Sequence, residues 1–418
     1  ATVCLLRAGH ALHPAISELP TKWDLRVFVT ERPWSAIGWT PVCIYPFAIG
    51  LAWFMPQDLA FSTWFFYLFW KGQMVLREWL GWGSLAGPYA SDQSAGAWIA
   101  VGLFALGASR RPIAEALRRA WRSDARDAAE PVSARGALML FAGGLAGMVG
   151  FLHAVGLDWW PALGFVLVWG VLAVAVTRMR AELGPPTHDL YFAGPDWALT
   201  ASFGPAALGV RNLTALSMLF WLTRDYRSLP MPHQLEALRL HDWHQTRRGD
   251  GRRLAAALLL VGVVGFLAAC ATALTQYYEQ GGLTGIRGYG TWLARESFNR
   301  LESWMTTAKP GPDHAALTQF AGGGALTLGM MALRRRFLGV PFHPVGYAIA
   351  GSWTMSWLWF SVFLSWLIKG FVLRHGGLRR FRAAMPFFLG LMLGDYVVGG
   401  GVTLLSLWLN QPVPGFFT

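Results

Sequence analysis

The stretch Leu254-Ala-Ala-Ala-Leu-Leu-Leu-Val-Gly-Val-Val-Gly-Phe-Leu-Ala-Ala-Cys-Ala-Thr-Ala-Leu-Thr275 decides the fold class. It contains no Asp, Glu, Lys or Arg, and it is long enough to cross a bilayer as a helix, which takes about 20 apolar residues. We expect further spans at 36–54, 59–77, 94–109, 136–156, 160–177, 315–333, 353–373 and 385–409. The sequence therefore predicts an all-α, polytopic integral membrane protein.

Composition excludes the soluble and nucleic-acid-binding classes. Apolar residues make up 54% of the chain and charged residues only 14%, whereas a soluble domain carries roughly 25% charged residues. The net charge of +12 comes from arginines that fall in short clusters between the apolar spans, where the positive-inside rule places them. The expected partner of this surface is the lipid bilayer, and no nucleic acid is expected.

The arginine clusters also test the number of crossings. They occupy 110–135, 224–253, 334–336 and 369–382. If all four face the cytoplasm, the chain must cross an even number of times between successive clusters. Segment 183–222 must then cross twice or dip in and return, and segment 338–352 must supply a short second crossing beside 353–373. We expect about 9 to 12 transmembrane helices, two of them broken or re-entrant.

Proline and glycine interrupt both of these segments. Segment 183–222 contains Gly184-Pro185-Pro186, and segment 338–352 contains Pro341 and Pro344. Irregular backbone at membrane depth is tolerated only where protein or a water-filled cavity satisfies its amide and carbonyl groups. Such discontinuous helices hold the substrate in many secondary transporters. The alternative is a proline kink packed against its neighbours, or a surface loop for 338–352.

The predicted division of the chain is sequential. We expect an amino-terminal interfacial segment, a first transmembrane helix group, a polar cytoplasmic loop and a second helix group, at 1–35, 36–223, 224–252 and 253–418. The second group carries an amphipathic insert at 276–314, expected to lie at the membrane interface. The chain opens with Ala1 rather than Met and shows no signal-peptide pattern, so it is interpreted as a fragment, a processed product or a chain whose beginning is missing.

Candidate site residues concentrate around the first broken segment. They are Glu182, His188, Asp189 and Asp196, which could bind a cation, relay protons or hold a polar substrate. An ionisable group within a membrane is energetically expensive and is therefore a functional candidate. The alternative is a solvated loop in which Asp196 caps the following helix. Arg211, deep in the next apolar run, is expected to pair with one of these acids or with an anionic substrate group.

Two further candidates lie in the second helix group. Asp395 sits inside the last span with no charge near it in sequence, so it needs a partner from another helix. His343 lies in the second broken segment, between Phe342 and Pro344. For Asp395 a structural network is the alternative to a substrate or ion pathway.

No catalytic constellation is visible, and an enzyme is not expected. His241 and His244 share one helix face, but zinc would need further ligands. Neither a metal nor a cofactor is expected. Asp58 is interpreted as a helix cap, and Lys71 as a side chain that reaches to the interface.

Three blocks resemble a known family: Gly50-Leu-Ala-Trp-Phe-Met-Pro-Gln-Asp-Leu-Ala-Phe-Ser-Thr-Trp-Phe-Phe-Tyr-Leu-Phe-Trp-Lys71, Phe342-His-Pro-Val-Gly-Tyr-Ala-Ile-Ala-Gly351, and Trp366 to Arg380 continuing to Pro386-Phe-Phe-Leu-Gly-Leu-Met-Leu-Gly-Asp395. The chain is similar to an uncharacterised family of large bacterial polytopic membrane proteins, known only as a domain of unknown function. That family is loosely similar to oligopeptide-type secondary transporters. The resemblance implies a multi-pass protein of the bacterial cytoplasmic (inner) membrane.

Two functional hypotheses follow. The first is a secondary transporter of a small polar solute, with its site between segments 183–222 and 338–352. The second is a structural or accessory subunit of a larger membrane assembly, because 23 tryptophans suit a protein that packs against other subunits or against further copies of itself.

Overall fold

The computed structural model describes residues 22–82, 90–122, 132–184, 190, 194–224, 229–243, 250–281, 289–337 and 339–409. The chain divides into two compact units, and each is described by itself. Unit 1 comprises Ala1–Ala97, Leu183–Asp189 and Ala325–Thr418; unit 2 comprises Trp98–Glu182 and Leu190–Gly324. The units are built from interleaved stretches, and the sequential division expected above stays a prediction.

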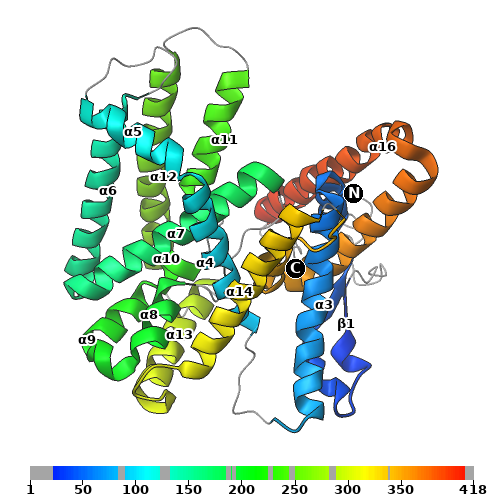
Figure 1. Ribbon diagram of the computed structural model, residues 1–418, viewed down its shortest axis with the longest axis horizontal. Coiled ribbons are helices and arrows are strands. Elements are labelled where there is room, and N and C mark those ends of the chain that lie inside the picture. The colour runs from blue at the N-terminus through cyan, green and yellow to red at the C-terminus, as the bar shows by residue number, and fades with distance from the viewer. Residues whose placement is uncertain are drawn as a thin grey trace. The chain divides into compact units, whose positions relative to one another are not determined.

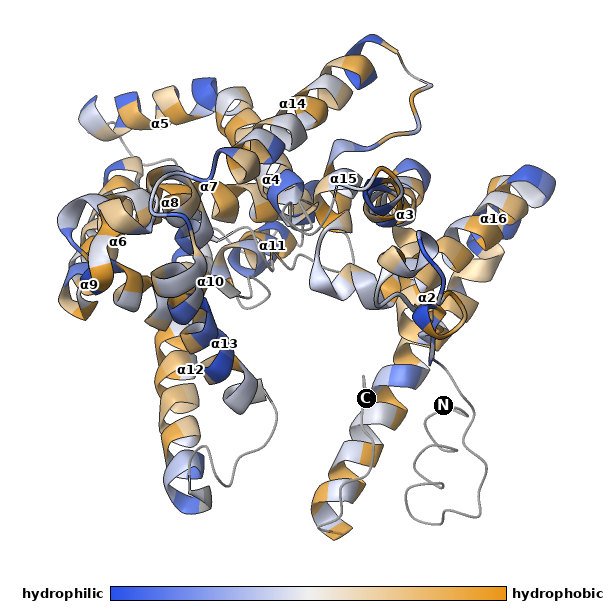
Figure 2. Ribbon diagram, turned by 90° about the horizontal axis from the view of Figure 1, so that it is seen from below, coloured by the Kyte–Doolittle hydropathy of each residue, from blue (hydrophilic) through white to orange (hydrophobic). Residues whose placement is uncertain are grey.

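The all-α class is confirmed. Within the described residues, five helices are long and apolar enough to cross a membrane: α6 (Ala134–Val155), α7 (Trp159–Leu183), α12 (Asp250–Gln280), α14 (His314–Arg336) and α16 (Trp353–Leu409). They cover the predicted spans at 136–156, 160–177, 254–275, 315–333, 353–373 and 385–409. Figure 2 shows the hydrophobic colour running along most of α12. Apolar side chains on such helices face lipid without penalty.

One predicted span is wrong. Residues 36–54 form no continuous helix; the chain there runs through η2 (Trp34–Ile37), β2 (Pro41–Cys43) and the nine-residue α2 (Pro46–Phe54). Strand β2 pairs antiparallel with β1 (Lys22–Asp24), which leads into the short helix η1 (Leu25–Val27). Pro41 and Pro46 explain the difference, because a proline inside a helix lacks the amide hydrogen and clashes with the preceding turn.

Helices α3 (Gln57–Trp79) and α4 (Ala90–Ala108) match the predicted spans 59–77 and 94–109, although neither is among the five. Helix α15 (Pro344–Ala350) packs on α3, where a Cβ on Gly346 would overlap Ser62. Its seven residues extend only about 10 Å, too short for a membrane crossing. The short crossing expected over 338–352 is therefore not made by a helix.

Helix α16 bends sharply at Gly377, whose φ of +60° belongs to the left-handed region. Figure 1 shows the two arms of α16 meeting at this bend. Helix α2 contacts both arms. Tyr45, just before α2, donates its amide hydrogen to Ser361 on the first arm (3.0 Å), and Trp53 stacks on Phe388 of the second arm with ring centroids 3.8 Å apart.

Unit 2 contains shorter helices beside the long ones. They are α5 (Arg110–Arg122), α8 (Pro195–Phe203), α9 (Pro205–Met218), α10 (Phe220–Arg224), α11 (Pro230–Trp243), α13 (Tyr289–Glu302) and the π-helix η4 (Ser303–Thr307). Its core gathers Leu152, Phe165, Leu199 and Leu216 from α6, α7, α8 and α9. Helices α8 and α9 are therefore anchored between two of the long apolar helices.

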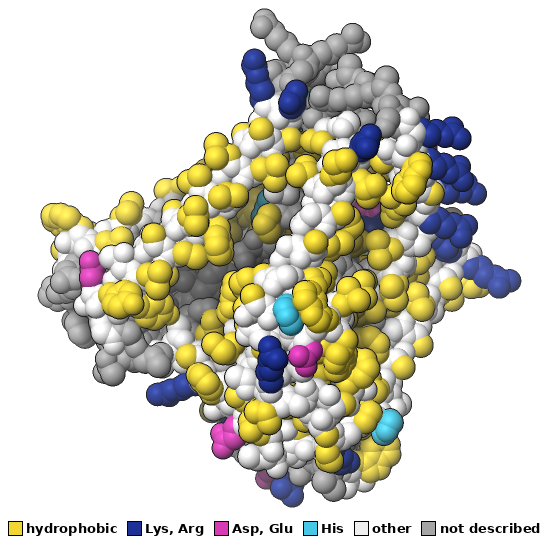
Figure 3. Space-filling view, turned by 90° about the vertical axis from the view of Figure 1, so that its left-hand side faces the viewer, with side chains coloured by type: hydrophobic (Ala, Val, Ile, Leu, Met, Phe, Trp, Pro, Cys, Tyr) yellow, Lys and Arg dark blue, Asp and Glu magenta, His cyan; other side chains and the backbone are white. Residues whose placement is uncertain are grey.

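Helix α5 is amphipathic. Ile113, Leu117 and Trp121 share one face, while Arg118 and Arg122 lie off it. Figure 3 shows a face on which hydrophobic side chains predominate and Lys and Arg gather along the top and right edges. Apolar surface with basic margins suits a protein whose flanks contact lipid chains and whose ends contact headgroups.

Candidate functional site

An ion pair fastens the second broken segment in unit 1. Arg334, at the end of α14, lies 2.6 Å from the carboxylate of Asp58 in the first turn of α3. The same guanidinium donates hydrogen bonds to the carbonyl oxygens of Val340 (3.3 Å) and Phe342 (3.5 Å). Arg334 therefore satisfies backbone that leaves the helical path before α15. The interpretation of Asp58 as a helix cap is wrong, because α3 begins at Gln57 and Pro56 holds the N-cap position; Asp58 stands in the first turn and pairs with Arg334 instead.

His343 is held by hydrogen bonds close to this ion pair. Its amide donates to the hydroxyl of Ser62 at 2.6 Å, and its ring Nδ1 accepts a hydrogen bond from the amide of Val345 at 3.2 Å, which caps α15. Because Nδ1 accepts, the neutral ring carries its hydrogen on Nε2. Burial, and then the positive charge of Arg334, lower the pKa of His343 to about 4, against a smaller opposing effect of Asp58.

Two lysines of unit 1 are buried against carbonyl oxygens. The ammonium group of Lys369 on α16 donates to the carbonyl of Met55 at 2.6 Å, where Pro56 separates α2 from α3. Lys71 on α3 donates to the carbonyls of Ile37 (3.0 Å) and Trp39 (2.8 Å). A buried carbonyl without a partner is destabilising. These lysines therefore stabilise irregular backbone, and Lys71 is buried rather than extended to the interface as the sequence suggested.

Asp395 has a partner on another helix, as predicted, but that partner is a backbone amide. Its carboxylate accepts a hydrogen bond from the amide of Phe47 at 3.1 Å, in the first turn of α2. A carboxylate at a helix N-terminus pairs an otherwise unbonded amide and interacts favourably with the helix dipole. This geometry supports the structural alternative for Asp395. Its role in a substrate or ion pathway stays a prediction.

The most deeply buried carboxylate of the predicted set is Asp196 in unit 2. Its side chain is only 2% exposed, and its Oδ2 lies 2.5 Å from a guanidinium nitrogen of Arg300 on α13. The guanidinium of Arg300 also lies over the rings of Phe220 (4.4 Å) and Trp304 (5.3 Å). Asp196 stands in the first turn of α8, where the positive end of the helix dipole favours its negative charge.

The backbone around Asp196 is discontinuous, as the glycines and prolines predict. Gly204 (φ +79°) separates α8 from α9, and Gly209 (φ +73°) breaks α9 itself. A Cβ on Gly204 would overlap the backbone of Gly311. The loop before α14 is hydrogen-bonded at the same break, through Pro310 O to the amide of Ala206 at 3.0 Å.

Among the described residues, Arg211 pairs with neither Glu182 nor Asp196. It lies 3.8 Å from Asp158, in the turn between α6 and α7, and its side chain is 66% exposed. Its neighbour Asn212 bonds the same carboxylate at 2.7 Å and accepts from the amide of Asp158 at 2.8 Å. Proximity in sequence to Asp196 was misleading because the break at Gly209 redirects the helix.

Glu182 forms a surface ion pair with Arg178 one turn earlier on α7, at 2.7 Å. His188 and Asp189 lie outside the described residues. Glu182, Asp196 and Arg211 thus have three different ion-pair partners in unit 2, whereas His343 and Asp395 belong to unit 1. The roles of all seven predicted residues, and a site between segments 183–222 and 338–352, stay predictions.

Sequence reasoning missed the arginines that pair with Asp196 and Asp58. Arg300 lies in the insert that was expected at the membrane interface, and Arg334 lies in an arginine cluster that was expected to face the cytoplasm. A signal was present for Arg300, because Phe298 and Trp304 flank it with aromatic rings that favour guanidinium stacking. No sequence signal joins Arg334 to Asp58, which are far apart in the chain.

The Asp196–Arg300 and Asp58–Arg334 pairs share one arrangement. Each joins a carboxylate in the first turn of a helix to an arginine on another element, beside broken backbone. No curated protein and no solved structure matches the chain. A family model described as "Family of unknown function (DUF6785)" matches residues 1–418. Because this match covers the whole chain, the protein belongs to that family of unknown function.

Proposed function

We propose that this protein is a secondary transporter of a small polar solute. The observation that carries the proposal is the buried Asp196–Arg300 ion pair at the start of a helix that is broken twice, at Gly204 and Gly209. Discontinuous helices of this kind supply both free backbone groups and helix ends to a bound solute. A buried charge pair beside them provides a group whose state a coupling ion can change.

The coupling step would act on Asp196. A proton or a cation at its carboxylate removes the attraction that holds Arg300, and α13 is then free to move against α8. Arg300 would remain over its two aromatic rings, so that the change is a shift in position rather than a loss of all contacts. The loop bonded at Gly204 would transmit such a shift to α14.

The proposed location is the bacterial cytoplasmic membrane, with several crossings. Two contacts of unit 1 support a common side for two arginine clusters: Arg334 contacts Asp58, and Lys369 contacts Met55 in the adjoining turn. The bend of α16 that follows Lys369 carries the rest of the fourth cluster. The positive-inside rule assigns this end to the cytoplasm.

The test is solute-driven charge movement across proteoliposomes that contain the full chain. Dipeptides and amino acids are the first solutes, chosen because the sequence resemblance described above implies a loose similarity to oligopeptide-type transporters. We expect Asp196→Asn to abolish the signal and Glu236→Gln to retain it. Glu236 is a matched control because it pairs with Arg180 at 2.6 Å on the more exposed surface of unit 2. Equal signals from Asp196→Asn and wild type would remove Asp196 from the mechanism.

The alternative is a structural subunit of a membrane assembly. Helix α12 favours this alternative, because no residue of its most apolar stretch is buried within the chain and another subunit could cover it. Lipid covers such a helix equally well. Purification in mild detergent separates the two hypotheses: a stable complex with other subunits supports assembly, and a lone chain stabilised by a transported solute supports transport.

A further inference from the structure

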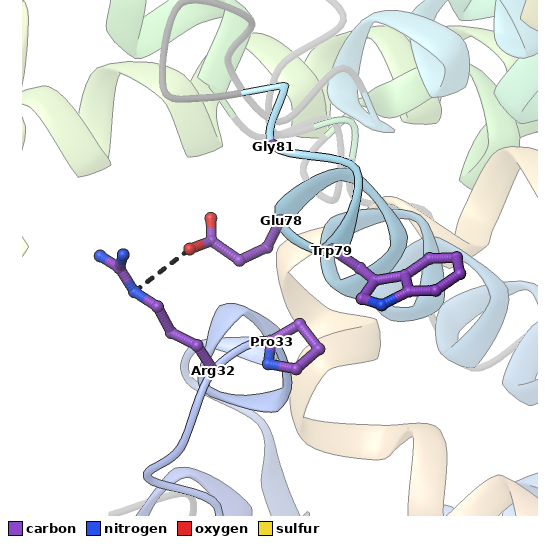
Figure 4. Close-up of a pocket in the computed structure, with 5 residues that line it drawn as sticks. All are labelled: Arg32, Pro33, Glu78, Trp79 and Gly81. Carbon is purple, nitrogen blue, oxygen red and sulfur yellow. Dashed lines mark ion pairs between the residues drawn. The ribbon is translucent and has the colours of Figure 1, made fainter.

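We propose that a surface pocket in unit 1 binds the headgroup of a zwitterionic aminophospholipid, with Arg32 holding the phosphate and Glu78 the ammonium group. The pocket has a volume of 420 Å³ and is lined by Arg32, Pro33, Glu78, Trp79 and Gly81. Figure 4 shows the two charged side chains extending toward one another, Arg32 from the turn before η2 and Glu78 from the end of α3. This inference does not depend on transport.

The α3 wall of the pocket is rigidly built. Gly81, with φ of +69°, follows the last turn of α3. The amide of Trp82 donates to the carbonyl of Arg77 and the amide of Gly81 to that of Glu78, each at 3.1 Å. This pair of bonds is the Schellman arrangement that ends many helices. It fixes the directions in which Glu78 and Trp79 leave the backbone.

The charges match a zwitterion. Arg32 Nε lies 3.3 Å from Glu78 Oε1, and the two side chains are 86% and 35% exposed. Within the described ranges neither has another ion-pair partner. An exposed pair of this kind contributes little to stability, so a ligand that carries both charges can replace it at little loss. A ligand with a single charge would leave one of the two side chains unpaired.

The end of α3 adds to this preference. Glu78 lies in the last turn of the helix, where free carbonyl groups and the negative end of the dipole attract cations. The ammonium group of an aminophospholipid would find the Glu78 carboxylate and these carbonyls together. The phosphate of the lipid would lie toward Arg32, in the turn before η2. A guanidinium can donate two parallel hydrogen bonds to a phosphate.

The position of the pocket suits a lipid rather than a soluble zwitterion. Trp34, Trp79 and Trp82 surround this end of α3 and are 62%, 71% and 68% exposed, as in the aromatic belts at membrane interfaces. From Asp58 to Trp79, α3 rises about 32 Å. That is close to the roughly 30 Å of the hydrocarbon core. With the Asp58–Arg334 pair at one interface, the pocket lies at the other.

The experiment is native mass spectrometry of the full chain in non-ionic detergent, titrated with short-chain phosphatidylethanolamine or phosphatidylglycerol. We expect tighter binding of phosphatidylethanolamine. Arg32→Gln and Glu78→Gln should each weaken it about tenfold, through loss of one charge-assisted contact. Arg26→Gln is the matched control, because Arg26 is also exposed and paired, with Asp24 at 3.5 Å, but does not line the pocket.

Three outcomes would overturn the proposal. Phosphatidylethanolamine affinities unchanged in both pocket variants would show that the lipid binds elsewhere. Equal or tighter binding of phosphatidylglycerol, insensitive to Glu78→Gln, would indicate an anionic site instead. Soluble phosphoethanolamine that binds as tightly as the lipid would show that the ligand is a free solute.

Discussion

A double-mutant cycle on Asp196 and Arg300 tests whether the buried ion pair stabilises the fold around the broken helices. Removing one partner of a buried pair typically destabilises a protein by 3–5 kcal/mol, because the other charge is left without compensation. The side chain of Arg300 is 23% exposed and stays over the Phe220 ring. We therefore expect Asp196→Asn and Arg300→Met each to lower the free energy of unfolding by about 3 kcal/mol.

The double variant leaves no buried charge, so its loss should be well below the sum of the two single losses. We expect a coupling free energy of about 2 kcal/mol, measured by denaturant unfolding in mixed micelles followed by circular dichroism. The Arg180–Glu236 pair is the control: its side chains are 30% and 41% exposed, and its coupling should be below about 1 kcal/mol. Additive effects of Asp196→Asn and Arg300→Met within about 0.5 kcal/mol would refute the argument.

Three further predictions concern unit 1. Gly346→Ala places a Cβ against Ser62 and should destabilise the protein by about 1–3 kcal/mol, whereas Gly400→Ala, which meets no atom within 4 Å, should not; equal melting temperatures would contradict the packing. The pKa of His343 is lowered to about 4 in the fold, so its contribution to stability is present above pH 6.5 and is lost as the pH falls toward 4. His343→Asn can still cap α15 but cannot take up this proton. We therefore expect the melting temperature of the variant to depend less on pH between pH 7.5 and 5 than that of the wild type. Lys369→Met leaves the carbonyl that ends α2 unpaired and should lower stability by about 1–3 kcal/mol, with Lys369→Arg closer to wild type in the same thermal assay.

Some features of the structure were predictable because they depend on local sequence. The apolar length of α12 and the prolines and glycines around α8 set where helices form and where they break. Hydrophobic length and backbone dihedral preference need no information about distant residues. For the same reason the sequence predicted a broken segment before α16, where α15 is short.

The predicted span 36–54 failed for a related reason. Its hydropathy is that of a membrane helix, yet Pro41 and Pro46 divide it and Gly38 leaves the helical region, so its backbone groups bond elsewhere. The hydroxyl of Ser361, on α16, meets the carbonyl of Cys43 at 2.9 Å. Hydropathy reports whether a segment can be buried, and it says nothing about which partner satisfies its amides and carbonyls.

The sequence by itself determined that this is an all-α membrane protein with broken helices, because apolar length and proline or glycine content act locally. Only the tertiary structure decided which partner each of these charged side chains contacts. Asp196 meets Arg300, Asp58 meets Arg334, and Asp395 meets a backbone amide of α2. A charge within a membrane protein must find a partner wherever the packing of helices places one, and that packing brings together residues separated by 100 positions or more.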